Sequence, residues 1–207
     1  MKMQQTLQPP FPTLAGALWR EAGSKNARAF RALALAVGGS LLLTLSAKVQ
    51  IPFYPVPFTM QTFVVLVIGM VCGARLAAAT MLLYLGEGAL GLPVFAAGGG
   101  AAYFTGPTAG FLLSFPLAAA LLGVLAARGW DRRFTSTVAA MLLGTAVIFA
   151  CGLSWLALFV GWQKAAAAGL APFLFSEPLK ILLAAFALPG AWKLLGKKSG
   201  ENEKGRG

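Results

Sequence analysis

The chain has 207 residues, of which 58% are hydrophobic and only 11% are charged, and its formal net charge is +11. A water-soluble domain carries about 25% charged residues, so this composition excludes an ordinary soluble protein. The chain contains no histidine, which excludes Ser-His-Asp catalysis and histidine metal sites. Its two cysteines, Cys72 and Cys151, lie in separate apolar runs without metal-ligand spacing. We therefore expect no catalytic residue, no metal and no bound cofactor.

Continuous apolar runs predict an all-α integral membrane protein, because only helices and closed barrels satisfy backbone hydrogen bonds in lipid. A membrane barrel would instead show segments of about ten residues with alternating polarity. Turn residues divide the apolar runs into six predicted transmembrane helices, at residues 27–47, 59–72, 76–92, 109–127, 135–160 and 178–195. The second has about 14 residues, which is roughly 21 Å of helix. We expect its neighbours to cover part of it.

The basic residues predict the orientation of these helices. Of the 17 Lys and Arg, only Lys48, Lys164 and Lys180 fall on one side of the predicted membrane domain, and the other 14 fall on the opposite side. Cytoplasmic loops carry the excess of positive charge, so both termini are predicted to be cytoplasmic. The chain then consists of a cytoplasmic segment (1–26), a six-helix domain (27–195) and a basic tail (196–207), in the cell membrane. The net charge reflects this topology, and we expect no nucleic-acid partner.

The external side collects the unusual segments, which are the proline-rich loop 48–58, the glycine-rich loop 93–108 and the loop 161–175. Gln61, Tyr84 and Glu87 also lie near external helix ends. No ladder of ionisable residues continues through the bilayer depth, as a proton-coupled pump would place there. The pattern therefore predicts a ligand pocket that opens to the outside, with an apolar base.

Two opposite charges, Glu177 and Lys180, stand at the start of the sixth predicted helix. Ser176 is a predicted helix cap, and Pro178 suits the first helical turn. Residues three apart share one helix face. In one interpretation the pair is an interfacial cap with a lysine that extends to the surface. In the other it is the polar end of a pocket for a small ligand that offers both N–H donors and carbonyl or carboxylate acceptors.

Other residues also allow two interpretations. Gln61 is either a polar helix-end residue or part of the pocket, and the glycines 98–100 are either flexible or allow close approach of the backbone to a ligand. Trp155 lies about 10 Å deeper than Trp162, so we expect it to face the bundle interior. The aromatic residues of the external side are either interface anchors or pocket walls, and they are Phe53, Tyr54, Phe58, Tyr84, Phe95 and Tyr103.

The first predicted helix carries Ala32 and Ala36, with small residues beyond them. Small residues at a spacing of four let another helix approach closely. This spacing either arises by chance in an alanine-rich chain or marks a docking strip for a partner protein.

The segment "IPFYPVPFTMQTFVVLVIGMVCGARLAAATMLLYLGEGALGLPVFAAGGG", followed by "TGPTAGFLLSFPLAA" and "SEPLK", closely resembles the BioY family. Members are biotin-specific substrate-binding (S) components of energy-coupling-factor (ECF) transporters. The resemblance covers about residues 27–195. It implies six helices, cytoplasmic termini, and biotin held near the outer surface under the first and third loops. It also implies a transmembrane coupling (T) protein and two cytosolic ATPases as partners, with Ala32 and Ala36 as docking residues.

The resemblance also implies roles at the site. The acid-x-x-Lys pair of the family matches Glu177 and Lys180, although its acid is more often aspartate. We expect Glu177 to accept an N–H of the biotin ureido ring and Lys180 to donate to the ureido carbonyl or, alternatively, to the valerate carboxylate. The remaining predicted substrate-binding residues are Gln61, Tyr84, Phe95, Gly98, Gly99 and Trp155. A solitary biotin carrier, a carrier for another vitamin and a membrane enzyme are the alternatives.

Overall fold

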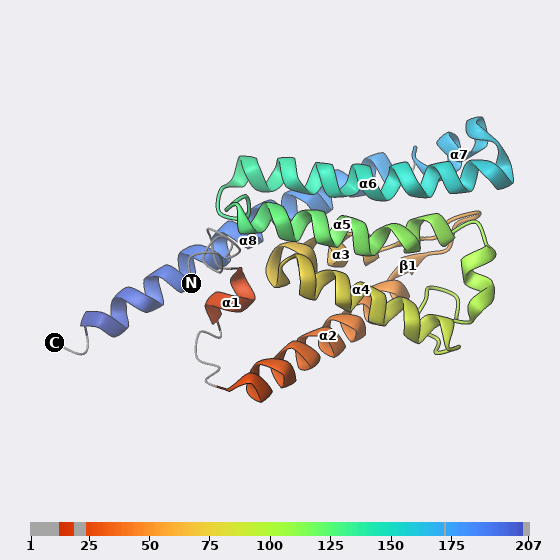
Figure 1. Cartoon of the computed structure of the whole chain (residues 1–207). Coiled ribbons are helices and arrows are strands. Elements are labelled where there is room, and N and C mark those ends of the chain that lie inside the picture. Colours follow the sequence, from red (N-terminus) through yellow and green to blue (C-terminus); the bar gives the residue numbers. More distant parts are fainter. Residues whose placement is uncertain (1–12, 19–23, 172, 205–207) are drawn as a thin grey trace, which may run out of the picture.

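In the computed structural model, most described residues are helical (Figure 1). The structure describes residues 13–18, 24–171 and 173–204. In chain order the elements are α1 (Leu14–Leu18), α2 (Lys25–Lys48), β1 (Gln50–Ile51), β2 (Phe58–Thr59), α3 (Gln61–Cys72), α4 (Ala74–Ala89), the 3-10 helix η2 (Ala101–Thr105), α5 (Ala109–Ala127), α6 (Phe134–Val160), α7 (Trp162–Gly169) and α8 (Phe173–Lys204).

Four helices of the described residues are long and apolar enough to cross a membrane, namely α2, α5, α6 and residues Phe173–Leu195 of α8. The predicted helix at 109–127 coincides with α5, and the others agree with observed helices to within a few residues at most ends. Helices α3, with 12 residues, and α4, with 16, fall short of that length. The prediction of an all-α membrane fold is thus confirmed by four such helices.

Helix α3 lies in the centre of the molecule and contacts α2, α4, α5, α6 and α8. Helices α2, α4, α5 and α6 lie in a row in which each contacts the next, and α8 packs against α6 and α3 (Figure 1). Val65, Leu66 and Met70 of α3 are fully buried in the core. The prediction that neighbours cover this short helix is therefore confirmed.

The outer faces of the long helices expose large apolar side chains, such as Phe30 and Leu45 on α2, Leu117 on α5 and Phe186 on α8. In water such a surface would be an aggregation hazard, whereas in a bilayer it meets hydrocarbon. The buried core and the exposed surface are therefore both apolar, as a membrane-embedded bundle requires.

The two ends of the bundle differ. Helix α1 and the C-terminal end of α8 lie at one end, and the β1–β2 ribbon and α7 lie at the other (Figure 1). The strands pair antiparallel, with Gln50 opposite Thr59 and Ile51 opposite Phe58. The prolines between them cannot continue α2, so the chain turns back here as a ribbon.

Two predicted details of the C-terminal part are wrong. The loop 161–175 contains a helix, α7, whose run of four alanines favours helix formation. Helix α8 also begins before Ser176, at Phe173, and the backbone N–H of Phe173 donates to the carbonyl of Leu170 at the end of α7 at 2.9 Å. Ser176 is therefore not the cap: its hydroxyl lies inside the helix and bonds to the carbonyl of Phe173. Pro178 likewise lies inside α8 rather than at its start.

At the end of the bundle opposite the ribbon, a polar contact joins α8 to the α5–α6 turn. The indole Nε1 of Trp192 donates to Oδ2 of buried Asp131 at 2.6 Å. The guanidinium of Arg132 lies 4.3 Å from the centroid of the Trp192 ring. Burial raises the pKa of Asp131, whereas the bond from Trp192 favours the charged carboxylate. Trp192 thus anchors a tertiary contact.

We predict that Trp192→Phe lowers the free energy of unfolding by about 1.5–3 kcal/mol, because it removes a hydrogen bond to a buried carboxylate. Thermal unfolding of purified protein in detergent measures this. Trp162→Phe is the matched control, since Trp162 is 68% exposed, and its effect should stay within about 0.5 kcal/mol. Equal effects of the two substitutions would contradict the assignment of Trp192 as an anchor.

Candidate substrate-binding site

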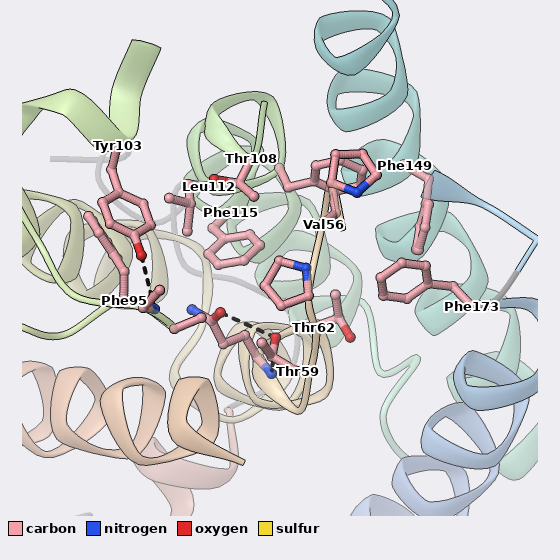
Figure 2. Close-up of a pocket in the computed structure, with 16 residues that line it drawn as sticks. Val56, Thr59, Thr62, Phe95, Tyr103, Thr108, Leu112, Phe115, Phe149 and Phe173 are labelled. Carbon is pink, nitrogen blue, oxygen red and sulfur yellow. Dashed lines mark hydrogen bonds between the residues drawn. The ribbon is translucent and has the colours of Figure 1, made fainter. Parts of the chain in front are cut away.

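A cavity of about 240 Å³ lies at the end of the bundle that carries the β1–β2 ribbon (Figure 2). This volume is near the lower limit for small-molecule sites, about 300 Å³. The β1–β2 connection contributes Pro55, Val56 and Pro57, and the loop after α4 contributes Phe95, Ala96 and Ala97. Residues of α3, α5, α6 and α8 complete the walls. The predicted pocket at the loop-bearing end is thus present as a cavity.

One side of the cavity is aromatic. Phe111 and Phe115 stand four residues apart on α5, so they share a helix face. Phe149 of α6 and Phe173 of α8 complete this wall, with ring centroids 5.2 Å apart and nearly perpendicular planes. Figure 2 shows the rings of Phe115, Phe149 and Phe173 around the cavity. None of these four was predicted as a site residue, because a phenylalanine in an apolar helix has no feature that separates a ligand wall from a lipid-facing side chain.

The polar side of the cavity is formed where β2 meets α3, by Thr59, Gln61 and Thr62. Nε2 of Gln61 donates to the hydroxyl of Tyr84 at 2.7 Å, and that hydroxyl donates to the carbonyl of Val94 at 3.0 Å. Tyr84 is fully buried behind Gln61 and does not line the cavity. It therefore orients Gln61 rather than forming a wall, which corrects the prediction for Tyr84.

The pair Glu177 and Lys180 lies behind the two threonines. Nζ of Lys180 is 2.7 Å from Oε1 of Glu177, and it donates at 3.0 Å to both the hydroxyl of Thr62 and the carbonyl of Thr59. The hydroxyl of Thr62 in turn donates to the same Oε1 at 3.0 Å. All three N–H groups of the ammonium therefore have protein acceptors. Glu177 and Lys180 are not among the residues that line the cavity, and Thr59 and Thr62 connect them to it.

Both charged residues are buried, since Glu177 is 5% exposed and Lys180 is 7% exposed. The interpretation of Lys180 as a lysine that extends to the surface is therefore wrong. Among the residues that the structure describes, Oε2 of Glu177 has no hydrogen-bond partner. A buried carboxylate oxygen without a donor carries an uncompensated desolvation cost. A ligand N–H that reached Oε2 would satisfy this acceptor.

The glycine-rich loop forms a tight turn at residues 95–98. Phe95 and Gly98 exchange two backbone hydrogen bonds, of 2.8 and 3.3 Å. Gly98 has φ +140°, and a Cβ on Gly99 would lie 2.0 Å from the carbonyl oxygen of Leu92. Both glycines therefore shape the loop and lie outside the cavity lining, where we had expected close approach to a ligand. Phe95 lines the cavity as predicted.

Trp155 does not line the cavity, contrary to its prediction. It lies in a separate groove between α5 and α6, and its Nε1 donates to the carbonyl of Gly106 at 2.9 Å. The rotation of α6 about its axis, which depth along the helix does not predict, directs this residue toward Gly110 of α5.

The two predicted docking residues on α2 differ in their exposure. Ala32 is exposed, whereas Ala36 is only 8% exposed. Ala36 is therefore closed to a partner in this structure, because the rest of the chain covers it.

The sequence model of the BioY family matches residues 6–197. The chain is 40% identical over 140 residues to a Pyrococcus horikoshii protein named a probable biotin transporter BioY, a match that covers 67% of this chain and 82% of that protein. It is 36% identical over 146 residues to the biotin transporter BioY of Thermotoga maritima, with 70% and 85% covered.

A solved structure has the same fold. The crystal structure of an S-component for biotin from an ECF-type ABC transporter matches with a TM-score of 0.69 at 20% identity, over 83% of this chain and 95% of that chain. The family predicted from the sequence motifs is thus confirmed, and the chain belongs to the BioY family of transporters.

Proposed function

We propose that this protein is the biotin-binding S component of an ECF-type uptake transporter. One observation carries the proposal: a buried carboxylate oxygen, Oε2 of Glu177, has no donor among the described residues and belongs to a network that reaches the cavity through Thr62. Biotin offers two ureido N–H groups, an adjacent carbonyl and an apolar bicyclic ring. The names of the relatives support the same ligand.

In the proposed complex, a ureido N–H donates to Oε2 of Glu177. Gln61 keeps one amide N–H beyond its bond to Tyr84, and this N–H is available for the ureido carbonyl. Lys180 already uses its three N–H groups, so direct donation from Lys180 to biotin would require one of these bonds to be exchanged. We therefore assign Lys180 the role of holding Glu177 and Thr62 in position. The bicyclic ring packs against the phenylalanines of α5 and α6.

We further propose that all six main helices cross the cell membrane, with both termini in the cytoplasm. Helices α3 and α4 are about 18 and 24 Å long, less than the hydrocarbon thickness of about 30 Å. Neighbouring helices cover most of α3, so lipid does not have to solvate its ends. The basic residues support this orientation, and it places the cavity at the outer surface.

A transmembrane coupling protein and two cytosolic ATPases complete the proposed transporter. The chain has no nucleotide-binding loop of its own, and the structural neighbour is described as part of an ECF-type ABC transporter. We propose that the coupling protein docks on the exposed side of α2 that includes Ala32. The whole subunit then reorients in the membrane to deliver biotin inward.

We predict that Glu177→Gln raises the Kd for biotin about 10- to 100-fold, because the substitution removes a charged acceptor worth about 1.5–3 kcal/mol. Titration of purified protein with labelled biotin measures this. Glu87→Gln is the matched control, since Glu87 bonds to Ser40 and does not line the cavity. A biotin analogue methylated at its ureido nitrogens should bind the wild type weakly and show a smaller loss with Glu177→Gln. Equal losses with both ligands would contradict the proposed contact.

Lys180→Ala should weaken biotin binding by about 2–5 kcal/mol, because it leaves the carboxylate of Glu177 buried and unpaired. Lys164→Ala is the control, since Lys164 is an exposed lysine on α7. Unchanged affinity in a Lys180→Ala protein with a normal unfolding transition would remove this assignment.

Uptake tests the transporter as a whole. In cells that lack every coupling protein, we expect this chain to give no uptake of labelled biotin above background, and we expect co-expression of a coupling protein and two ATPases to restore it. Full uptake by the chain alone would instead support a solitary biotin carrier. Failure of biotin to bind, with binding of another vitamin, would support a different substrate.

A further inference from the structure

The turn at residues 95–98, which lines the cavity, is held by one side chain from α2 and one from β1. Nζ of Lys48 donates to the carbonyl of Phe95 at 2.7 Å, and Nε2 of Gln50 donates to the carbonyl of Ala96 at 3.0 Å. Phe95 and Ala96 both line the cavity. Two consecutive carbonyls of the turn are therefore held by donors at the C-terminal end of α2 and in β1.

The two sides of the turn are anchored in different ways. The ring of Phe95 is buried. Its centroid lies 5.3 Å from the ring centroid of Tyr84 and 4.9 Å from that of Tyr103. Beyond it, the backbone N–H of Ala97 bonds to the hydroxyl of Tyr103 at 2.9 Å. These contacts all come from α4 and from the loop that contains the turn. The bonds from Lys48 and Gln50, in contrast, reach the turn from the C-terminal end of α2 and from β1.

The hydrogen bonds of Lys48 and Gln50 can break and re-form, which would release and recapture the 95–98 turn. Lys48 is exposed, and in the described part of the chain its ammonium has no carboxylate partner. Both bonds are only part-buried, so water can replace their donors, and breaking them costs less than breaking the buried pair of Glu177 and Lys180. The structure thus combines a strongly held ion pair, Glu177 and Lys180, with weaker hydrogen bonds that hold the 95–98 turn.

The bonds that hold the 95–98 turn are also connected to the ion pair of Glu177 and Lys180. Gln50 pairs with Thr59 in the β1–β2 ribbon, and the carbonyl of Thr59 accepts a hydrogen bond from Lys180. Consecutive contacts therefore link Lys180 to Thr59, Thr59 to Gln50, and Gln50 to Ala96. Lys48 is the last residue of α2, so a shift of this helix would move the donor that holds Phe95.

We propose that Lys48 and Gln50 are positioning residues that latch the 95–98 turn over the cavity and set the rates of ligand entry and exit. This inference rests on the proposed function for its ligand. A latched turn slows passage in both directions, so loss of the latch accelerates both entry and exit.

The first test measures kinetics with labelled biotin. Lys48→Met keeps the length of the side chain and removes the donor. We expect both the association and the dissociation rate constants to rise at least about tenfold, with Kd changed by less than about threefold, since the loss of one charged hydrogen bond favours the open turn. Lys48→Arg should restore slow exchange, and Lys164→Met is the matched control. Rate constants within twofold of the wild type would overturn the proposal.

The second test needs no biotin. Leu112 lines the cavity and is 5% exposed, so a cysteine placed there by Leu112→Cys reports access to the interior. In a background with Cys72→Ala and Cys151→Ala, we expect maleimide to react at least about tenfold faster when Lys48→Met or Gln50→Leu is present. Unchanged labelling in both variants would overturn the latch. Faster labelling in a protein that does not bind biotin would support the latch and overturn the proposed ligand.

Discussion

The buried ion pair of Glu177 and Lys180 is the interaction on which the site depends. Two charges inside an apolar bundle are costly unless their polar groups find partners, because the desolvation penalty amounts to several kcal/mol for each ion. Lys180 meets this condition through Glu177, Thr62 and Thr59, so the pair also fixes α8 against the start of α3. Glu177 meets it only in part, since Oε2 remains without a donor. The same interaction therefore stabilises the fold and leaves a place for a ligand.

Helix α8 is held by polar contacts near its start and at Trp192, and by apolar packing between them. The ion pair acts near its start, and the bond from Trp192 to Asp131 acts fifteen residues later, roughly 22 Å along the helix. Between them, Ile181, Ala184 and Leu188 are buried. Apolar packing alone would allow the helix to rotate or slide in an apolar environment, whereas two directional bonds define its register. That register places Phe173 in the wall of the cavity.

Apolar side chains have three different environments in this molecule, which are the core, the cavity and the exposed outer surface. Phe149 lines the cavity, whereas Phe159, ten residues along the same helix, is half exposed on the outside. Hydropathy is the same for both, so the direction of each side chain depends on how the helix is rotated against its neighbours. Trp155 was misassigned for this reason. The phenylalanines of α5, α6 and α8 could not be predicted as site residues for the same reason.

The sequence by itself determined the class of fold, the approximate positions of the helices and the family, and it singled out the pair of charges three residues apart without deciding whether the pair is buried. These features are local, since they depend on apolar runs, turn residues, charge distribution and short motifs. Only the tertiary structure decided that α8 begins at the end of α7, that Thr59 and Thr62 connect the ion pair to the cavity, and that Lys48 reaches the carbonyl of Phe95. These features depend on how helices pack against one another. The spacing of residues within one segment does not predict how that helix is rotated against a helix that is distant in the sequence.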